Sequence, residues 1–185
     1  MIVETEYTPN PDTLKFLPGK KVSDVGPLEF NKNEKNINIP LANKILSLEG
    51  TLMVFFGENF ITVKKEKNLN WEDLKHGIIS EINEHYSKGN DVVVKKNPAD
   101  TSIAKKPTQS DEIINKINEV LDTKIRPAVA RDGGDIKFSS FKDGVVTVEL
   151  KGSCSGCPSS IMTLKQGVQN LLCHYIPEVK SVEAK

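Results

Sequence analysis

The segment of residues 96–109 constrains the fold of this chain more than any other feature, because it has almost nothing to contribute to a hydrophobic core. Its sequence, KNPADTSIAKKPTQ, carries two prolines, three lysines and no apolar periodicity. Such a composition is typical of a linker between domains. In a chain of 185 residues, each side is still long enough to bury a core of its own. We therefore predict two small domains, residues 1–95 and 110–185, joined by the linker 96–109.

Apolar patterns predict six elements in the first domain, in the order β-β-α-β-β-α. A turn that contains Pro9 and Pro11 separates the first two strands. Pro40 can begin the first helix, which Gly50 ends, and Asn70 can cap the second helix. The predicted strands are residues 3–7, 14–17, 51–56 and 60–63, and residues 30–38 are predicted to form a loop.

The second domain is predicted to have the order α-β-β-α-β, so the whole chain is expected to be an α+β protein. Ser110 can cap the first helix, and Arg126-Pro127 weakens or ends it. Asp143-Gly144 is a strong hairpin signal between the two following strands, and Pro158 can begin the last helix. The predicted strands are residues 136–141, 145–150 and a short one near 179–183.

Two cysteines, Cys154 and Cys157, lie three positions apart where the strand at 145–150 gives way to the helix that Pro158 begins. Both thiols are therefore expected at the positive end of the helix dipole, which favours thiolate over thiol. Gly152 and Gly156 carry no side chains, so backbone N–H groups can approach the sulfur atoms. We expect this loop to lie outside the core and to hold a ligand through two thiolates.

A pair of cysteines at this spacing occurs in redox dithiols, zinc sites and iron–sulfur half-sites. A thioredoxin-like dithiol is disfavoured, because an antiparallel strand precedes the motif and only a short stretch of chain follows Cys157. A zinc site needs four ligands from one chain, and Cys173 with His174 would complete the count. The predicted helix excludes this zinc site, because a rise of 1.5 Å per residue puts Cys173 ~24 Å from Cys157. Cys173 is also predicted on the outer or partly covered face of the helix, where it binds nothing.

An iron–sulfur cluster of the common kinds is held by four thiolates, and one chain offers two usable ones. A symmetric dimer that brings two Cys154–Cys157 loops face to face supplies all four. Such a cluster would bridge the subunits near the surface and would be released when the dimer loosens. This arrangement suits a carrier better than an electron-transfer protein.

The other polar candidates carry weaker signals. His76 and His85 lie on or beside a helix face with no cysteine near in sequence, which indicates surface or packing roles. Gly133-Gly134 could cradle a phosphate, but no further nucleotide-binding motif accompanies the pair, so we interpret it as a structural turn. Asp132 and Asp135 are interpreted as Asx-turn residues around these glycines rather than as a catalytic carboxylate pair.

Charge and composition argue against several classes of protein. Basic and acidic residues number 25 each, and they are also nearly balanced within each predicted domain, so nucleic-acid binding is not expected. No apolar run approaches the ~20 residues of a membrane span, and no membrane association is expected. Three cysteines, an odd number, argue against a secreted disulfide framework. The first residues match neither a signal peptide nor a transit peptide.

Several motifs together resemble one known family. In the second domain they are Arg126-Pro127, Asp132-Gly133-Gly134-Asp135, Gly152-x-Cys154-x-x-Cys157-Pro158-Ser159-Ser160 and Thr163-Leu164-Lys165-x-Gly167. In the first domain they are Thr8-Pro9-Asn10-Pro11-Asp12-x-Leu14-Lys15-Phe16 and Phe55-Phe56-Gly57. The first set resembles the C-terminal domain of NifU-like (Nfu) iron–sulfur proteins, and the second set resembles their N-terminal domain. Together the two cover almost the whole chain.

The resemblance implies a scaffold or carrier, not an enzyme, that binds a [4Fe-4S] cluster between two protomers and passes it to apo-proteins. In the family the two C-x-x-C cysteines are the cluster and metal ligands, here Cys154 and Cys157, whereas Cys173 matches no ligand position. The implied partners are a second copy of the chain, apo iron–sulfur proteins as recipients and upstream cluster-assembly proteins as donors. Because the chain starts at its first strand, a bacterial cytoplasm is expected, with a processed mitochondrial matrix protein as the alternative.

Two other functions stay open at this point. The same cysteines would serve a dithiol oxidoreductase, which would be colourless where a cluster carrier is brown. Alternatively, the N-terminal domain would be the functional part, as a module that docks other proteins.

Overall fold

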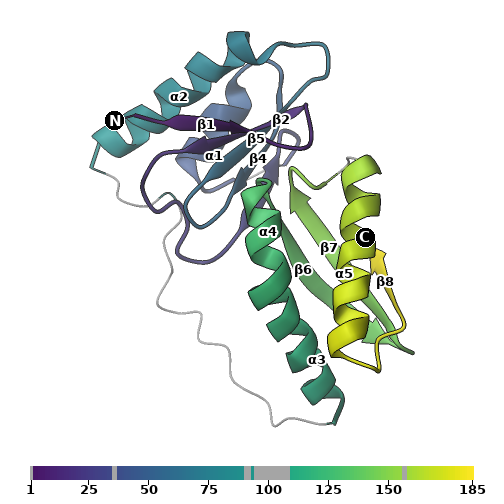
Figure 1. The fold of residues 1–185 in the computed structure, drawn as a ribbon. Coiled ribbons are helices and arrows are strands. Elements are labelled where there is room, and N and C mark those ends of the chain that lie inside the picture. The colour runs from purple at the N-terminus through teal and green to yellow at the C-terminus, as the bar shows by residue number, and fades with distance from the viewer. Residues whose placement is uncertain (1, 35–36, 90–92, 94–108, 156–157) are drawn as a thin grey trace. The chain divides into compact units, whose positions relative to one another are not determined.

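The computed structural model describes residues 2–34, 37–89, 93, 109–155 and 158–185 (Figure 1). The chain divides into two compact units, Met1–Asn97 and Pro98–Lys185. Each unit combines helices with one β-sheet, which confirms the predicted two-domain α+β fold. The predicted linker at 96–109 lies almost wholly outside the described residues, and its bounds stay a prediction. Among the helices that are described, none is both long and apolar enough to cross a membrane.

The described part of the first unit has these elements: β1 (Glu4–Tyr7), β2 (Thr13–Leu17), β3 (Leu28–Asn31), α1 (Pro40–Ser47), β4 (Thr51–Phe56), β5 (Ile61–Lys65) and α2 (Trp71–Ser87). The strands form one antiparallel sheet in the order β1-β2-β5-β4-β3. The two predicted hairpins, β1–β2 and β4–β5, are confirmed. β2 pairs with β5 and joins the hairpins, with Phe16 opposite Ile61.

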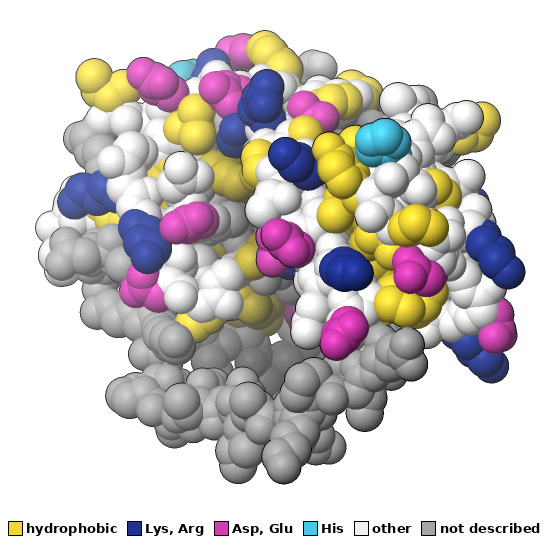
Figure 2. All heavy atoms as spheres, turned by 60° about the horizontal axis from the view of Figure 1, so that its bottom comes forward, with side chains coloured by type: hydrophobic (Ala, Val, Ile, Leu, Met, Phe, Trp, Pro, Cys, Tyr) yellow, Lys and Arg dark blue, Asp and Glu magenta, His cyan; other side chains and the backbone are white. Residues whose placement is uncertain are grey.

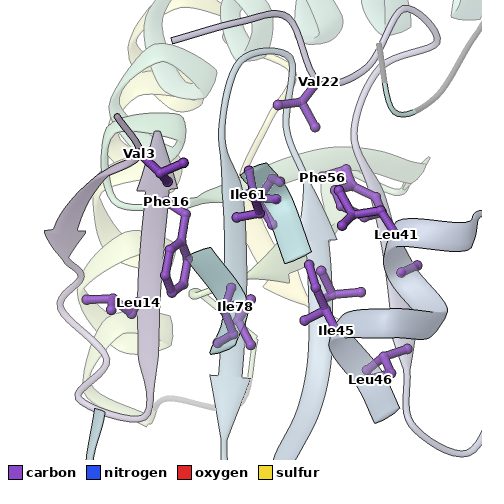
Figure 3. Close-up of a cluster of buried hydrophobic side chains, with 14 of the residues drawn as sticks. Val3, Leu14, Phe16, Val22, Leu41, Ile45, Leu46, Phe56, Ile61 and Ile78 are labelled. Carbon is purple, nitrogen blue, oxygen red and sulfur yellow. The ribbon is translucent and has the colours of Figure 1, made fainter. Parts of the chain in front are cut away.

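Both helices of the first unit pack on the same face of this sheet. Side chains alternate along a strand, so Phe16, Ile61 and Phe56, which lie across from one another on β2, β5 and β4, point to one side. Figure 3 shows them gathered with Ile45 of α1 and Ile78 of α2. All five are fully buried, and each such side chain contributes about 1.5–3 kcal/mol to stability. The first core is therefore built from one sheet face and two helices.

The strand β3 corrects the prediction of a loop over residues 30–38. It pairs with β4 at the edge of the sheet, where Phe30 lies opposite Val54 and its ring centroid lies 6.1 Å from that of Phe56. The strand has four residues and follows Gly26-Pro27, so its alternation is too short to identify from sequence. The observed order is β-β-β-α-β-β-α, one strand more than predicted.

The described part of the second unit has these elements: α3 (Gln109–Val120), η1 (Leu121–Ile125), α4 (Arg126–Arg131), β6 (Gly134–Lys142), β7 (Val145–Gly152), α5 (Pro158–Tyr175) and β8 (Ser181–Ala184). This is the predicted order α-β-β-α-β, with the first helix in three parts. Asp143 and Gly144 join β6 to β7 with φ of 53° and 86°, as a type I′ hairpin turn requires. β8 pairs with β7 in parallel, so β7 is the central strand.

The core of the second unit also lies on one face of its sheet. β7 alternates between partly exposed and buried residues at every position, and Val146, Val148 and Leu150 are on the buried face. Ile136 of β6 lies opposite Leu150 and belongs to the same cluster. The helices and the last strand supply further buried members: Ile117, Leu121, Val129, Val168, Leu172 and Val182.

The first helical segment continues past Arg126-Pro127, where the sequence predicts that it weakens or ends. Figure 1 shows α3 and α4 on one continuous coil. Between them, η1 is a π-helical turn that leads into Arg126, whose N–H donates to the carbonyl of Leu121, five residues earlier. The wider turn relieves the clash that the Pro127 ring would make with the carbonyl four residues before it. Within the described residues the segment starts at Gln109, so the backbone of Ser110 is already helical.

Each unit should fold alone, because each encloses its own hydrophobic cluster. One cluster draws on residues 3–93 and the other on residues 113–184. A fragment of residues 110–185 is expected to unfold in one cooperative transition, with a free energy of unfolding of roughly 5 kcal/mol. Urea denaturation followed by circular dichroism measures this quantity. Gradual, non-cooperative unfolding would show that the second core depends on the first unit.

Candidate functional site

The cysteine loop, residues 153–157, connects β7 to α5, as the change of apolar period predicts. Cys154 lies in a turn directly after β7, and Pro158 is the first residue of α5. Cys157 and Gly156, which the sequence also singles out, lie outside the described residues. The loop thus starts from the central strand of the sheet and leads into the positive end of a helix dipole.

The turn in the loop begins at Gly152. Its φ of 68° lies in the left-handed region, which favours glycine. The N–H of Ser155 donates to the Gly152 carbonyl over 3.1 Å, and the Ser155 hydroxyl donates to the same oxygen over 2.8 Å. These contacts close a tight turn around Ser153 and Cys154. Gly152 shapes the loop through this backbone conformation, and the approach of backbone N–H groups to the sulfur atoms stays a prediction.

Ser153 ties this turn to the start of β6, a contact that the sequence does not reveal. Its N–H donates to the carbonyl of Gly133 over 3.2 Å, and its hydroxyl donates to the carbonyl of Asp132. Ser153 is 1% exposed, so these hydrogen bonds are shielded from water. Both acceptors belong to the turn between α4 and β6. That turn and the cysteine loop are therefore one hydrogen-bonded unit.

Cys154 is buried, which corrects the expectation that the loop lies outside the core. Its side chain is 5% exposed and belongs to the hydrophobic cluster of the second unit, where a thiol packs like a small apolar group. The sulfur lies against Gly134. A Cβ atom on Gly134 would come within 2.8 Å of the Cys154 Sγ and within 2.7 Å of the Lys151 carbonyl oxygen. Gly134 is thus the residue that makes room for the thiol beneath the loop.

Asp135 forms an ion pair near the loop, not the Asx turn that the sequence suggests. Its carboxylate lies 3.2 Å from the Nε of Arg126, which also donates to the carbonyl of Ile136 over 3.0 Å. Asp122 lies 2.9 Å from another nitrogen of the same guanidinium. Burial raises the pKa of Asp135, and the charge of Arg126 opposes this shift. Through this ion pair Asp135, on β6, joins the sheet to Arg126 in the first helical segment. Asp132 is exposed.

The raised pKa of Asp135 predicts a pH dependence of stability. Because the folded chain holds this proton more tightly than the unfolded chain, the stabilisation is fully present below the ordinary pKa of 3.8 and is lost as the pH rises through the raised value. The variant Asp135→Asn stays neutral. Its free energy of unfolding should therefore increase relative to that of the wild type as the pH rises from 3.8 through the raised pKa of Asp135. Urea denaturation of both proteins measures this difference, and a difference that shrinks with rising pH would contradict the assignment.

Cys173 lies near the far end of α5, remote from the loop. The helix has 18 residues, which at 1.5 Å per residue span about 27 Å, so a zinc site shared with the loop is ruled out as the sequence predicts. The Cys173 side chain is partly buried and packs against the core cluster. His174 is exposed, and its ring contacts Tyr175 edge-on at 5.0 Å. Among the residues that the structure describes, no group of three or more His, Cys, Asp or Glu side chains forms a metal site.

The two histidines and Gly133 take the roles that the sequence predicts. His76 is exposed on α2, and the ring of His85 contacts that of Tyr86 at 5.1 Å. Gly133, with a φ of 81°, lies in the turn before β6. On the face shown in Figure 2, the described Lys and Arg side chains are interspersed with Asp and Glu, and neither sign gathers into a patch. This distribution agrees with the charge balance of the sequence.

Two family models match the chain, one in each unit. A NifU-like domain matches residues 117–183, and a domain described as scaffold protein Nfu/NifU N terminal matches residues 3–89. Both matches agree with the resemblance that the motifs suggest.

Two curated relatives match 99% of this chain. The NFU1 iron-sulfur cluster scaffold homolog, mitochondrial, of Homo sapiens is 44% identical, and the match covers 71% of that protein. NifU-like protein 4, mitochondrial, of Arabidopsis thaliana is 42% identical, and the match covers 65% of it. The chain thus spans about two thirds of the length of these relatives.

Similar solved structures each match about half of this chain. A NifU-like protein of Saccharomyces cerevisiae, solved by NMR, is 23% identical over 52% of this chain and 87% of its own, with a TM-score of 0.48. A crystal structure of a Staphylococcus aureus protein is 26% identical over 44% of this chain and 98% of its own, with a TM-score of 0.39.

Proposed function

Because the chain belongs to the NifU-like (Nfu) family of iron–sulfur cluster scaffold proteins, we propose that it carries a [4Fe-4S] cluster. The cluster is the cargo: two copies of the chain hold it between them, and an apo-protein takes it from them. Cys154 and Cys157 of each copy are the ligands. The human relative is named as a scaffold homolog, which supports binding and release without catalytic turnover.

The number of available thiolates carries this proposal. A [4Fe-4S] cluster takes four, and the C-x-x-C motif of one chain supplies two. Cys173 does not join them, because the length of α5 separates it from the motif. Elsewhere in the described residues no metal-binding group of side chains offers an alternative. Two copies related by a twofold axis supply the four ligands.

The position of the loop favours the charged form of the ligands. Thiolate, not thiol, binds a metal. α5 begins at Pro158, directly after Cys157. The free backbone N–H groups and the positive dipole end of a helix start stabilise a negative charge such as a thiolate. The other end of the loop is joined to β7, which is paired with β6 up to Gly152. The ligands are therefore carried between a helix start and a central strand.

The partners follow from the nature of the cargo. A second copy of the chain completes the site, upstream cluster-assembly proteins donate the cluster, and apo iron–sulfur proteins receive it. Both relatives described above are named as mitochondrial. Their names favour a mitochondrial location over the bacterial cytoplasm for this chain.

A dithiol oxidoreductase is the rival that would use the same cysteines. The parallel pairing of β7 with β8 around α5 weakens the sequence-based objection to it, because the motif does lie in a β-α-β unit. The burial of Cys154 does not separate the two functions, since a cluster ligand and a reactive dithiol both need an accessible thiolate.

Anaerobic reconstitution of the apo-protein with iron and sulfide tests the proposal. We expect a brown protein with about four iron and four sulfide ions per two chains, and a Mössbauer spectrum typical of a [4Fe-4S] cluster. A colourless product whose two cysteines oxidise and reduce reversibly would support the oxidoreductase instead.

A further inference from the structure

The sulfur of Cys154 faces the interior of its own unit in this structure. The side chain is 5% exposed and packs in the hydrophobic cluster. A sulfur atom that binds a cluster shared with a second copy must instead face that copy. We propose that Ser153 is a positioning residue that clamps Cys154 inward in the apo-protein, and that cluster loading begins when this clamp opens.

Two hydrogen bonds make the clamp. The Ser153 N–H donates to the Gly133 carbonyl over 3.2 Å, and the Ser153 hydroxyl donates to the Asp132 carbonyl. Both run from the loop to the turn before β6, so they cross between two segments far apart in sequence. Cys154 is the next residue, and its direction follows from the backbone that these bonds hold. The Ser153 Oγ lies 3.8 Å from the Cys154 Sγ.

Gly134 provides the space into which the clamp directs the thiol. A side chain there would overlap the Sγ, since a Cβ would lie 2.8 Å from it. Gly134 is opposite Gly152 in the hairpin, directly below the point where the loop leaves β7. The inward position is thus defined from both sides, by the Ser153 hydrogen bonds above and by the missing Gly134 side chain below.

Ser155 offers a matched comparison within the same loop. It also follows β7 and its hydroxyl also donates to a carbonyl, but that carbonyl belongs to Gly152 in the same turn. Removing the Ser155 hydroxyl leaves the link to the start of β6 in place. Ser153→Ala removes the hydroxyl bond of that link to Asp132 and keeps the backbone N–H bond to Gly133. The two variants therefore separate the clamp from a general weakening of the loop.

The accessibility of the Cys154 thiol in the reduced apo-protein tests the clamp. The full-length chain is treated with iodoacetamide for increasing times, and modification of Cys154, Cys157 and Cys173 is quantified separately by tandem mass spectrometry. In the wild type, Cys154 should react at least about tenfold more slowly than in the same chain unfolded in urea, as a buried thiol does. Ser153→Ala should raise its rate by about five- to tenfold, the factor for losing one hydrogen bond of typical strength. Ser155→Ala should leave it unchanged.

Gly134→Ala tests the same inference from the other side. The added Cβ would lie 2.8 Å from the Cys154 Sγ and 2.7 Å from the Lys151 carbonyl oxygen, so both the sulfur and the adjoining backbone must shift, and the reaction of Cys154 should again be faster. Circular dichroism verifies the fold of each variant, and the comparison of the folded wild type with the chain in urea decides the matter if a variant does not fold. The inference is overturned if Cys154 of the folded wild type reacts as fast as in urea, if Ser155→Ala matches Ser153→Ala, or if Gly134→Ala slows the reaction. Only the loading step of this inference rests on the proposed function. The alkylation measurements use no iron, so their result on the clamp holds even if the protein binds no cluster.

Discussion

Cys154→Ser is expected to give a colourless protein that retains roughly a tenth or less of the wild-type iron after anaerobic reconstitution. Two copies of this variant offer two thiolates in place of four, and an alcohol at position 154 does not replace a thiolate ligand. Cys157→Ser should have the same effect. Iron and sulfide counts on the gel-filtered proteins measure it.

The burial of Cys154 requires a control for folding. A hydroxyl placed in the apolar cluster costs about 1–3 kcal/mol, so Cys154→Ser should be less stable than the wild type while still folded. Cys173→Ala is the matched control, since it removes the third thiol of the chain, a partly buried one at the other end of α5. It should keep the full cluster. An iron-free Cys173→Ala protein would mean that α5 does not isolate this residue from the site.

Cluster binding and dimerisation are expected to be one event. The apo-protein should be largely monomeric and the loaded protein dimeric, with about one [4Fe-4S] cluster per two chains. The cluster binds only the associated state, so linkage makes the dimer constant depend on iron and sulfide. A cluster at about 100 times its dissociation constant stabilises the dimer by roughly 2.7 kcal/mol, which is about a hundredfold.

Sedimentation velocity of one sample before and after chelation measures this coupling. A chelator should remove the colour and return the monomer together, and an apo-acceptor should do the same without chelator. A dimer that persists unchanged after all iron is removed would show that another surface holds the copies together. A brown monomer with four iron atoms per chain would contradict the shared cluster, because two cysteines do not supply four thiolates.

The elements that could be predicted are those with a local pattern over several residues. β7 alternates in hydrophobicity from Val146 to Lys151, and α2 repeats apolar residues at Leu74, Ile78 and Ile82. β3 alternates over only four residues, too few to identify it from sequence, and it is defined by its pairing with β4. The helix across Pro127 persists because η1 widens the turn and both flanks contribute buried residues to the core. These features depend on tertiary contacts that a local pattern does not contain.

The location of the candidate site could be predicted, but its packing could not. The change of apolar period places the loop between a strand and a helix. Counting outward from Asp143-Gly144 would put Asp135 opposite Gly152. A β-bulge between Phe138 and Ser140 shifts the register by one residue, so Gly134 takes that position instead. No local signal marks the bulge, and for this reason the burial of Cys154 and the contacts of Ser153 are found only in the structure.

The first half of β7, Val145–Val148, is paired on both edges, with β6 and with β8. Its amide protons should therefore exchange with solvent only when the whole second unit unfolds, whereas the turn after Gly152 is held by a few hydrogen bonds and opens at a much lower free energy. Local opening of the turn and global unfolding are thus separate events on separate timescales. The thiols can be presented and withdrawn many times within the lifetime of one folded molecule, and each cargo can arrive and leave while the strand that supports it stays closed.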